Sequence, residues 1–335
     1  MLGSGWTGTR LCLRDPRRFI TTTRTLEKLS KLTARGINAV QFDLQREETW
    51  SNLPPKSDIE ATIFTFEILA TCLPDLKRLL DRHIPTNQPI LCLGTSSCFE
   101  AESHESIVSE TAPLTGRSTF GTSLADRVKG EEWILSKGAT VLHLSGIAGE
   151  EDEENGSASR SVKSFLSAGY IQNGLRLINS IHINDICKII LILIEKIKEQ
   201  DGIENSNHIC GQRIITSCGA FRVQDWTRAL NMDPLPEIPP PDISFKRSKI
   251  LSIAKLVALL PEDYEWTLPV PGVEPVSRGL PTTGLDTEVA AAQDRQWELF
   301  KEDFRGKWQG NTMWYNKKRE MEMMKTWTTR PSLPR

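Results

Sequence analysis

Glycine residues near the start of the chain have the spacing of a phosphate-binding turn. Gly3, Gly5 and Gly8 form a G-x-G-x-x-G motif, with Trp6 and Thr7 between its second and third glycines. In such a motif the first glycine makes a tight turn, and the second lets the backbone approach a pyrophosphate. The third lets the following helix pack closely on its strand, and the N-terminus of that helix faces the anion. The motif therefore predicts that a dinucleotide binds here.

A basic residue lies where sites of this type select their nucleotide. Arg24 directly follows the segment Phe19–Thr23, which we predict to be the next strand. An acidic residue after this strand binds the ribose 2′-hydroxyl of NAD, whereas an arginine accommodates the 2′-phosphate of NADP. We therefore expect NADP as the cofactor, NAD as the alternative, and Lys28 or Arg17 as helpers of Arg24. The other interpretation of Arg24 is a solvated charge at the start of a helix.

The elements that must position these residues alternate between strands and helices. We predict strands at Phe19–Thr23, Ala39–Phe42, Ile59–Phe64, Pro89–Leu93 and Thr140–Leu144, and helices at Leu26–Ala34, Leu76–Arg82 and Arg127–Ser136. This alternation predicts an α/β, Rossmann-like fold with a doubly wound parallel sheet, in which ligands bind beyond the carboxyl ends of the strands. Only Met1 and Leu2 precede the first glycine, so we expect the first strand to be truncated.

The later part of the chain has a different character. Residues 150–157 are an acidic run that we interpret as a solvated loop, with metal binding as the lesser alternative. Further helices are predicted at Val162–Ala168, Ile183–Lys198 and Ile250–Leu260, an irregular connection at Pro234–Pro241 and a linker at Val270–Asp286. We therefore expect a nucleotide-binding domain over residues 1–149, a smaller substrate lobe with returning sheet elements over 150–285, and a tail containing a helix over 286–335.

Composition excludes several classes of partner. The chain of 335 residues has 41 Lys and Arg against 43 Asp and Glu, which argues against nucleic acid or an acidic membrane as partner. Its seven scattered cysteines predict a reducing compartment, cytoplasmic or organellar, and not secretion. The longest apolar run, Ile189–Ile194, is too short to cross a bilayer. His208, Cys210 and Cys218 lack the spacing of a metal site, so we expect no metal.

Four segments, in order along residues 1–275, resemble signatures of the extended and atypical short-chain dehydrogenase/reductase family, which includes NAD(P)-dependent epimerases and dehydratases. They are the glycine turn with Thr22–Arg24, then Phe42–Leu44, Leu91–Phe99, and Leu142–Gly149 with the later Ile181–Ile186. The third is similar to the S-S-T-S-V-Y-G segment of that family, and the fourth to L-R-x-x-G-I-Y-G and I-H-V-x-D-x-A. The resemblance implies that Asp43 and Leu44 close over the adenine, and it gives His182 and Asp185 a structural role that ties a helix N-terminus to the sheet.

The resemblance also implies a catalytic set that this chain does not fully carry. The family uses a tyrosine that moves a proton, a lysine four residues later that holds the nicotinamide ribose, and a Ser or Thr that binds the substrate oxygen. Thr95 falls on the Ser/Thr position and Lys129 on the lysine position, but the tyrosine position is Ala125. Ser123 and Asp126 are the nearest substitutes, although nothing in the sequence assigns the proton to either.

The sequence therefore leaves several functions open. The leading hypothesis is an NADP-binding protein of this family whose chemistry is lost or altered, because alanine has no proton to give. The alternatives are an active oxidoreductase or epimerase acting on a sugar nucleotide or a small carbonyl metabolite, a non-catalytic cofactor-binding scaffold, and a fragment of a fusion protein. Phe304–Gly310 resembles the opening strand of a lipocalin-type barrel, and is either a chance match or the start of such a second domain.

Overall fold

The computed structural model describes residues 1–85, 88–101, 106–114, 124–149, 176–200, 209–232 and 249–280, together with Val162, Leu166 and Gly174. Several expectations lie outside these residues: the acidic run, Ser123, His208, most of the helix at Val162–Ala168, the proline-rich connection and the tail with Phe304–Gly310. Within the described ranges no helix combines the length and apolar character needed to cross a membrane. All seven cysteines are free thiols.

The described residues form eleven strands and seven α-helices. The strands are β1 (Thr21–Thr23), β2 (Ala39–Gln41), β3 (Thr62–Phe64), β4 (Ile90–Thr95), β5 (Ser106–Val108), β6 (Thr140–Leu144), β7 (Gly146–Ala148), β8 (Leu177–His182), β9 (Arg213–Thr216), β10 (Gly219–Arg222) and β11 (Lys249–Leu251). The helices are α1 (Trp6–Arg14), α2 (Leu26–Ala34), α3 (Leu73–His83), α4 (Leu124–Leu135), α6 (Ile183–Gln200), α7 (Val223–Ala229) and α8 (Ala254–Val257). A short 3₁₀ helix, η4 (Ser96–Cys98), follows β4.

The main sheet is parallel, and Leu2 occupies a strand position inside it. β3, β4, β6 and β9 pair in that order, and β1 pairs with β2. Leu2 makes a parallel bridge to Phe64 of β3. On its other side the Met1 nitrogen donates to the carbonyl oxygen of Ile20 at 2.6 Å, and the Gly3 amide donates to Thr22 Oγ1 at 2.9 Å. The segment before the glycine turn therefore lies between β1 and β3, at the centre of the sheet.

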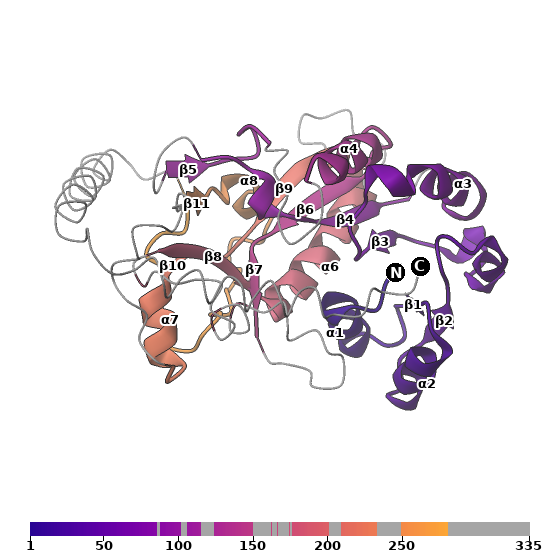
Figure 1. Ribbon diagram of the computed structural model, residues 1–335, viewed down its shortest axis with the longest axis horizontal. Coiled ribbons are helices and arrows are strands. Elements are labelled where there is room, and N and C mark those ends of the chain that lie inside the picture. Colours follow the sequence, from indigo (N-terminus) through magenta and orange to yellow (C-terminus); the bar gives the residue numbers. More distant parts are fainter. Residues whose placement is uncertain are drawn as a thin grey trace, which may run out of the picture.

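Helices cover both faces of this sheet, as the alternation of elements predicts (Figure 1). Neighbouring residues of a strand point to opposite faces. Accordingly, Ile63 and Leu91 belong to the core that contains residues of α1, α2 and α6. Phe64 and Cys92, one position later, belong to the core that contains residues of α3 and α4. The α/β, doubly wound prediction is therefore confirmed.

A second, smaller group of elements lies at the end of the molecule away from β1 and β2 (Figure 1). In its sheet β8 pairs with β7 in parallel and with β10 antiparallel. Its core gathers Phe221 with Trp226 of α7, and Val270 with Val273 from the segment after α8. The predicted linker at Val270–Asp286 is therefore wrong over its described part, since these two valines are buried.

The predicted helix at Ile250–Leu260 is wrong in its first half. Lys249–Leu251 is instead strand β11, which pairs in parallel with β5, and only Ala254–Val257 is helical. The side chain of Asn179 reinforces the strand, because its Nδ2 donates to the Lys249 carbonyl at 2.7 Å and its Oδ1 accepts from the Leu251 amide at 2.9 Å. Pairing with distant residues therefore outweighs the local helical periodicity.

Candidate functional site

The glycine turn has the geometry that its spacing predicts. Gly3 has a φ of +107°, and a Cβ there would collide with the side chain of Thr65. A Cβ on Gly8 would collide with the backbone oxygen of Gly3, so this glycine allows α1 to pack against the turn. At Gly5, in contrast, a Cβ would meet no atom within 4 Å. The turn is thus closed at two glycines and open at the middle one, which leaves room for a ligand to approach the backbone.

The first turn of α1 faces this open space with its backbone. Gly5 is the N-cap of α1, and the first turn contains no acidic side chain. The amide groups of a helix N-terminus and its dipole stabilise an anion. Trp6 is only 6% exposed and packs in the core, and Thr7 is also buried. These two residues therefore offer their amides, rather than their side chains, and the cradle fits the pyrophosphate of a dinucleotide.

Two cations gather at the carboxyl end of β1, beside the turn. Arg24 is exposed directly after β1. Lys28, in the first turn of α2, donates from Nζ to the carbonyl oxygen of Ser4 at 2.7 Å. Burial, and then the charge of Arg24, lower the pKa of Lys28. Arg17 precedes β1 and therefore lies toward the opposite end of the strand, so the structure brings Lys28, and not Arg17, to Arg24.

Asp43 and Leu44 follow β2, the neighbour of β1, and both are half-buried. The turn at Asp43 is fixed by its backbone, since the Asp43 amide donates to Thr49 Oγ1 at 2.9 Å and its carbonyl accepts from Trp50 Nε1 at 3.0 Å. Its carboxylate accepts from the Gln45 amide at 3.1 Å. Sequence reasoning missed the supporting role of Trp50, whose partner lies seven residues away.

The residues expected to do chemistry lie at the end of β4 and on α4. The half-buried Thr95 hydroxyl lies 3.0 Å from Ser97 Oγ and accepts from the Ser97 amide at 3.3 Å. On α4, Ala125 and Asp126 are half-buried and Lys129 is exposed. Arg127, two residues before Lys129, is buried and forms an ion pair with Glu67. The roles expected of Thr95 and Lys129 remain predictions, and Arg127 is a second cation that the sequence comparison overlooked.

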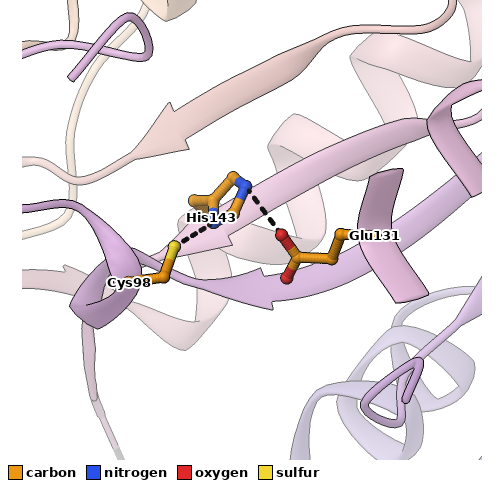
Figure 2. A group of neighbouring side chains, drawn as sticks. All are labelled: Cys98, Glu131 and His143. Atoms are coloured by element: carbon orange, nitrogen blue, oxygen red, sulfur yellow. Dashed lines mark hydrogen bonds and ion pairs between the residues drawn. The ribbon is translucent and has the colours of Figure 1, made fainter. Parts of the chain in front are cut away.

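The side chains of Cys98, Glu131 and His143 form a buried group that the sequence analysis did not assemble (Figure 2). His143 Nδ1 lies 3.0 Å from the Thr95 carbonyl oxygen and 3.4 Å from Cys98 Sγ. His143 Nε2 lies 3.4 Å from Glu131 Oε2. Burial raises the pKa of the Cys98 thiol to about 12, so it stays protonated. One possible metal-ligand atom from each of the three side chains lies within 4.8 Å of the others, although Cys98 and Glu131 face different nitrogens of the ring.

Lys249 of β11 holds the same loop from another side. Its Nζ donates to the carbonyl oxygen of Ser96 at 2.8 Å and to that of Phe99 at 2.6 Å. The Cys98 thiol donates to the Thr95 carbonyl at 3.0 Å. Residues 95–99 are therefore fixed by groups from two other strands, β6 and β11.

His182 and Asp185 have the structural role that was expected, with a different partner for Asp185. His182 Nδ1 accepts from the Asn184 amide at 3.1 Å at the start of α6. The buried Asp185 carboxylate accepts from the amide and hydroxyl of Thr267 at 2.8 and 3.0 Å. It also accepts from the Tyr264 hydroxyl at 3.2 Å. Asp185 thus ties α6 to the segment after α8, rather than to the sheet.

Comparison with solved structures identifies the fold. No protein-family model and no curated protein matches the sequence. The fold is that of NAD(P)-dependent epimerases, dehydratases and reductases, as the resemblance to the short-chain dehydrogenase/reductase family implies.

The individual structures are similar at low sequence identity. UDP-glucose-4-epimerase from Stenotrophomonas maltophila, with bound NAD, has a TM-score of 0.57 at 13% identity, covering 77% of this chain and 91% of its own. dTDP-glucose 4,6-dehydratase from Bacillus anthracis, in complex with NAD, has a TM-score of 0.56 at 13% identity, and the match covers 80% of this chain and 90% of the dehydratase. Yeast methylglyoxal/isovaleraldehyde reductase, complexed with NADPH, has a TM-score of 0.52 at 15% identity, and the match covers 79% of this chain and 91% of the reductase.

Proposed function

We propose that the protein binds NADP at the glycine turn, with NAD as a weaker ligand. The observation that carries this proposal is the open space at Gly5, between two glycines that are packed against other backbone and side-chain atoms. The amides at Gly5, Trp6 and Thr7 would hold the pyrophosphate. Gly3 and Gly8 shape the cradle. The similar epimerase and dehydratase hold NAD, and the similar reductase holds NADPH, which supports a dinucleotide in this fold.

The remaining contacts follow from the strands next to the turn. Arg24 would bind the 2′-phosphate, helped by Lys28, whose ammonium group is already held at Ser4. Asp43 and Leu44 would close over the adenine, and Lys129 would contact the nicotinamide ribose. When bound, the nicotinamide supplies hydride transfer. This chain's own residues bind and orient the cofactor.

Replacing Arg24 with alanine tests the 2′-phosphate contact. We expect NADPH to bind roughly tenfold to 100-fold more weakly, because one charged hydrogen-bonding partner of the 2′-phosphate is lost. NADH, which has no 2′-phosphate, is expected to bind nearly as before. Calorimetric titration of both nucleotides measures the difference. Arg17→Ala, which removes an exposed arginine near the other end of β1, is the matched control. Equal losses for NADPH and NADH in the Arg24 variant would refute the assignment.

We propose further that the chemistry is lost or altered relative to the similar enzymes. Ala125 has no proton to transfer, and Arg127, the first buried charged residue after it on α4, is an obligate cation. Thr95 would still orient a substrate oxygen at the end of β4. An active oxidoreductase or epimerase is the second candidate. It is favoured by the half-buried Thr95 hydroxyl on a fold whose similar members act on nucleotide sugars or small carbonyl compounds. A non-catalytic scaffold is the third.

Binding and turnover separate these candidates. At 100 times its dissociation constant, NADPH is expected to add about 2.7 kcal/mol to the free energy of unfolding, visible as a raised melting temperature. NADPH oxidation with methylglyoxal, and conversion of UDP-glucose and dTDP-glucose, are expected to stay at background. Turnover that Lys129→Ala removes would establish the enzyme instead. If neither NADPH nor NADH shifts the melting temperature, the binding proposal is wrong.

A further inference from the structure

The pair formed by Glu131 and His143 is buried within the main sheet and α4 (Figure 2). His143 is 0% exposed and Glu131 3%. Gly94 makes the room for them: a Cβ at this position would lie 2.8 Å from Glu131 Oε1 and 3.2 Å from His143 Nδ1. Gly94 is paired with His143 across β4 and β6. The sequence thus provides a place for a carboxyl group directly over the strand that ends in Thr95.

Hydrogen-bond geometry determines which ring nitrogen carries the proton. His143 Nδ1 lies 3.0 Å from the Thr95 carbonyl oxygen, which only accepts, so Nδ1 must be the donor. The Cys98 thiol donates to the same carbonyl, and therefore does not compete for that role. His143 Nε2 faces Glu131 Oε2 at 3.4 Å. Neither this nitrogen nor either carboxyl oxygen of Glu131 makes a hydrogen bond with any residue that the structure describes, and one proton between them, carried by an imidazolium or by a carboxylic acid, would supply one.

The surroundings decide between these two states. The charged and titratable groups around the pair are Arg127 and Glu132 on α4, Arg213 on β9, Glu67 after β3, Lys249 on β11, Cys92 on β4 and Cys98 on η4. Burial lowers the pKa of His143 to about 4, and the neighbouring arginines disfavour an imidazolium further. Burial raises the pKa of Glu131 to about 7, although Arg213 and Arg127 act in the opposite direction.

We infer that Glu131 and His143 are positioning residues that share one proton, held on the Glu131 carboxyl group, and that this neutral pair directs the His143 Nδ1 proton to the Thr95 carbonyl. Any effect of this pair on a bound substrate rests on the proposed role of Thr95. The shared proton itself is independent of that role. In water the order of the two groups is reversed, since imidazole there holds a proton more strongly than a carboxylate.

The pair is also sensitive to pH. When Glu131 loses its proton above neutral pH, its carboxylate faces the lone pair of Nε2, which is unfavourable. The imidazole then gains by moving its proton from Nδ1 to Nε2, and this removes the hydrogen bond to Thr95. The loop of residues 95–99 would then be held by Lys249 and Cys98 without His143.

Nitrogen NMR of the ¹⁵N-histidine-labelled protein tests the inference without any nucleotide. At pH 6 we expect a neutral His143 with its proton on Nδ1, and at pH 8 a shift toward the Nε2–H form. Glu131→Gln keeps a donor facing Nε2 but cannot titrate, so the Nδ1–H form is expected at both pH values. An imidazolium at pH 6, or the same protonated nitrogen at pH 6 and pH 8 in the unaltered protein, would overturn the inference.

Hydrogen exchange of the Ser97 and Phe99 amides, expressed as protection factors, tests the positioning role. In the unaltered protein we expect protection to fall about fivefold as pH rises through 7, because the hydrogen bond from His143 Nδ1 to Thr95 is lost, and to stay constant in Glu131→Gln, which cannot titrate. The same pH dependence in the unaltered protein and in Glu131→Gln would contradict positioning through the shared proton. Failure of NADPH to bind leaves each of these readouts unaffected, so the two proposals can fail separately.

Discussion

Replacing Gly5 with valine is expected to abolish NADPH binding while the protein keeps its fold. The backbone of Gly5 has φ −68° and ψ −172°, which any residue adopts, and a Cβ atom at this position meets no other atom within 4 Å. The valine side chain would instead fill the space through which a pyrophosphate must reach the amides of α1. We expect binding at least about 100-fold weaker, which corresponds to about 2.7 kcal/mol.

The free energy of unfolding of this variant is expected to change by no more than about 1 kcal/mol, the cost of a poorer N-cap. Gly8→Ala is the contrasting variant, because its Cβ would collide with the Gly3 backbone. It is expected to lose about 1–3 kcal/mol of stability as well as binding. Calorimetric titration and urea denaturation of both variants give the two quantities. Normal NADPH affinity in the valine variant would contradict the proposed site.

The parts of the fold that were predictable are those where local pattern and burial agree. The strand at Thr140–Leu144 and the helix at Leu26–Ala34 have the predicted bounds. An apolar strand between turns and an amphipathic helix can both be recognised from the local sequence alone. The closed environment of Gly3 and Gly8 and the open one of Gly5 also match the spacing of the motif. Strand β11 was not predictable, since Leu251 is in a strand only because β5 lies beside it.

The parts of the site that were not predictable depend on register between distant elements. Glu131 and His143 meet because α4 packs over β4 and β6, with Gly94 leaving space between them. The two residues are twelve positions apart, and this spacing alone does not predict the contact. On α4 itself, two positions change the direction of a side chain by more than half a turn. The structure therefore buries Arg127 and exposes Lys129, and counting from a motif could not distinguish them.

Replacing Asp185 with alanine is expected to produce the largest loss of stability among these variants, because this carboxylate is 0% exposed. It accepts hydrogen bonds from the Tyr264 hydroxyl and from both the amide and the hydroxyl of Thr267, and Lys188 Nζ lies 3.4 Å away. Alanine would leave these partly buried donors without the carboxylate. Removing one member of a buried charged network costs about 3–5 kcal/mol.

Asp225→Ala is the matched control, because Asp225 also lies in the first turn of a helix, α7, but its side chain is 41% exposed, and among the described residues its ion pair is with Arg228 at 3.2 Å. Its loss is expected to cost no more than about 0.5 kcal/mol. Urea denaturation of both variants measures the difference. Because Asp185 contacts the segment after α8 and not the glycine turn, folded Asp185→Ala protein is expected to keep its NADPH affinity. A stable Asp185→Ala protein with impaired NADPH binding would instead assign Asp185 to the nucleotide site.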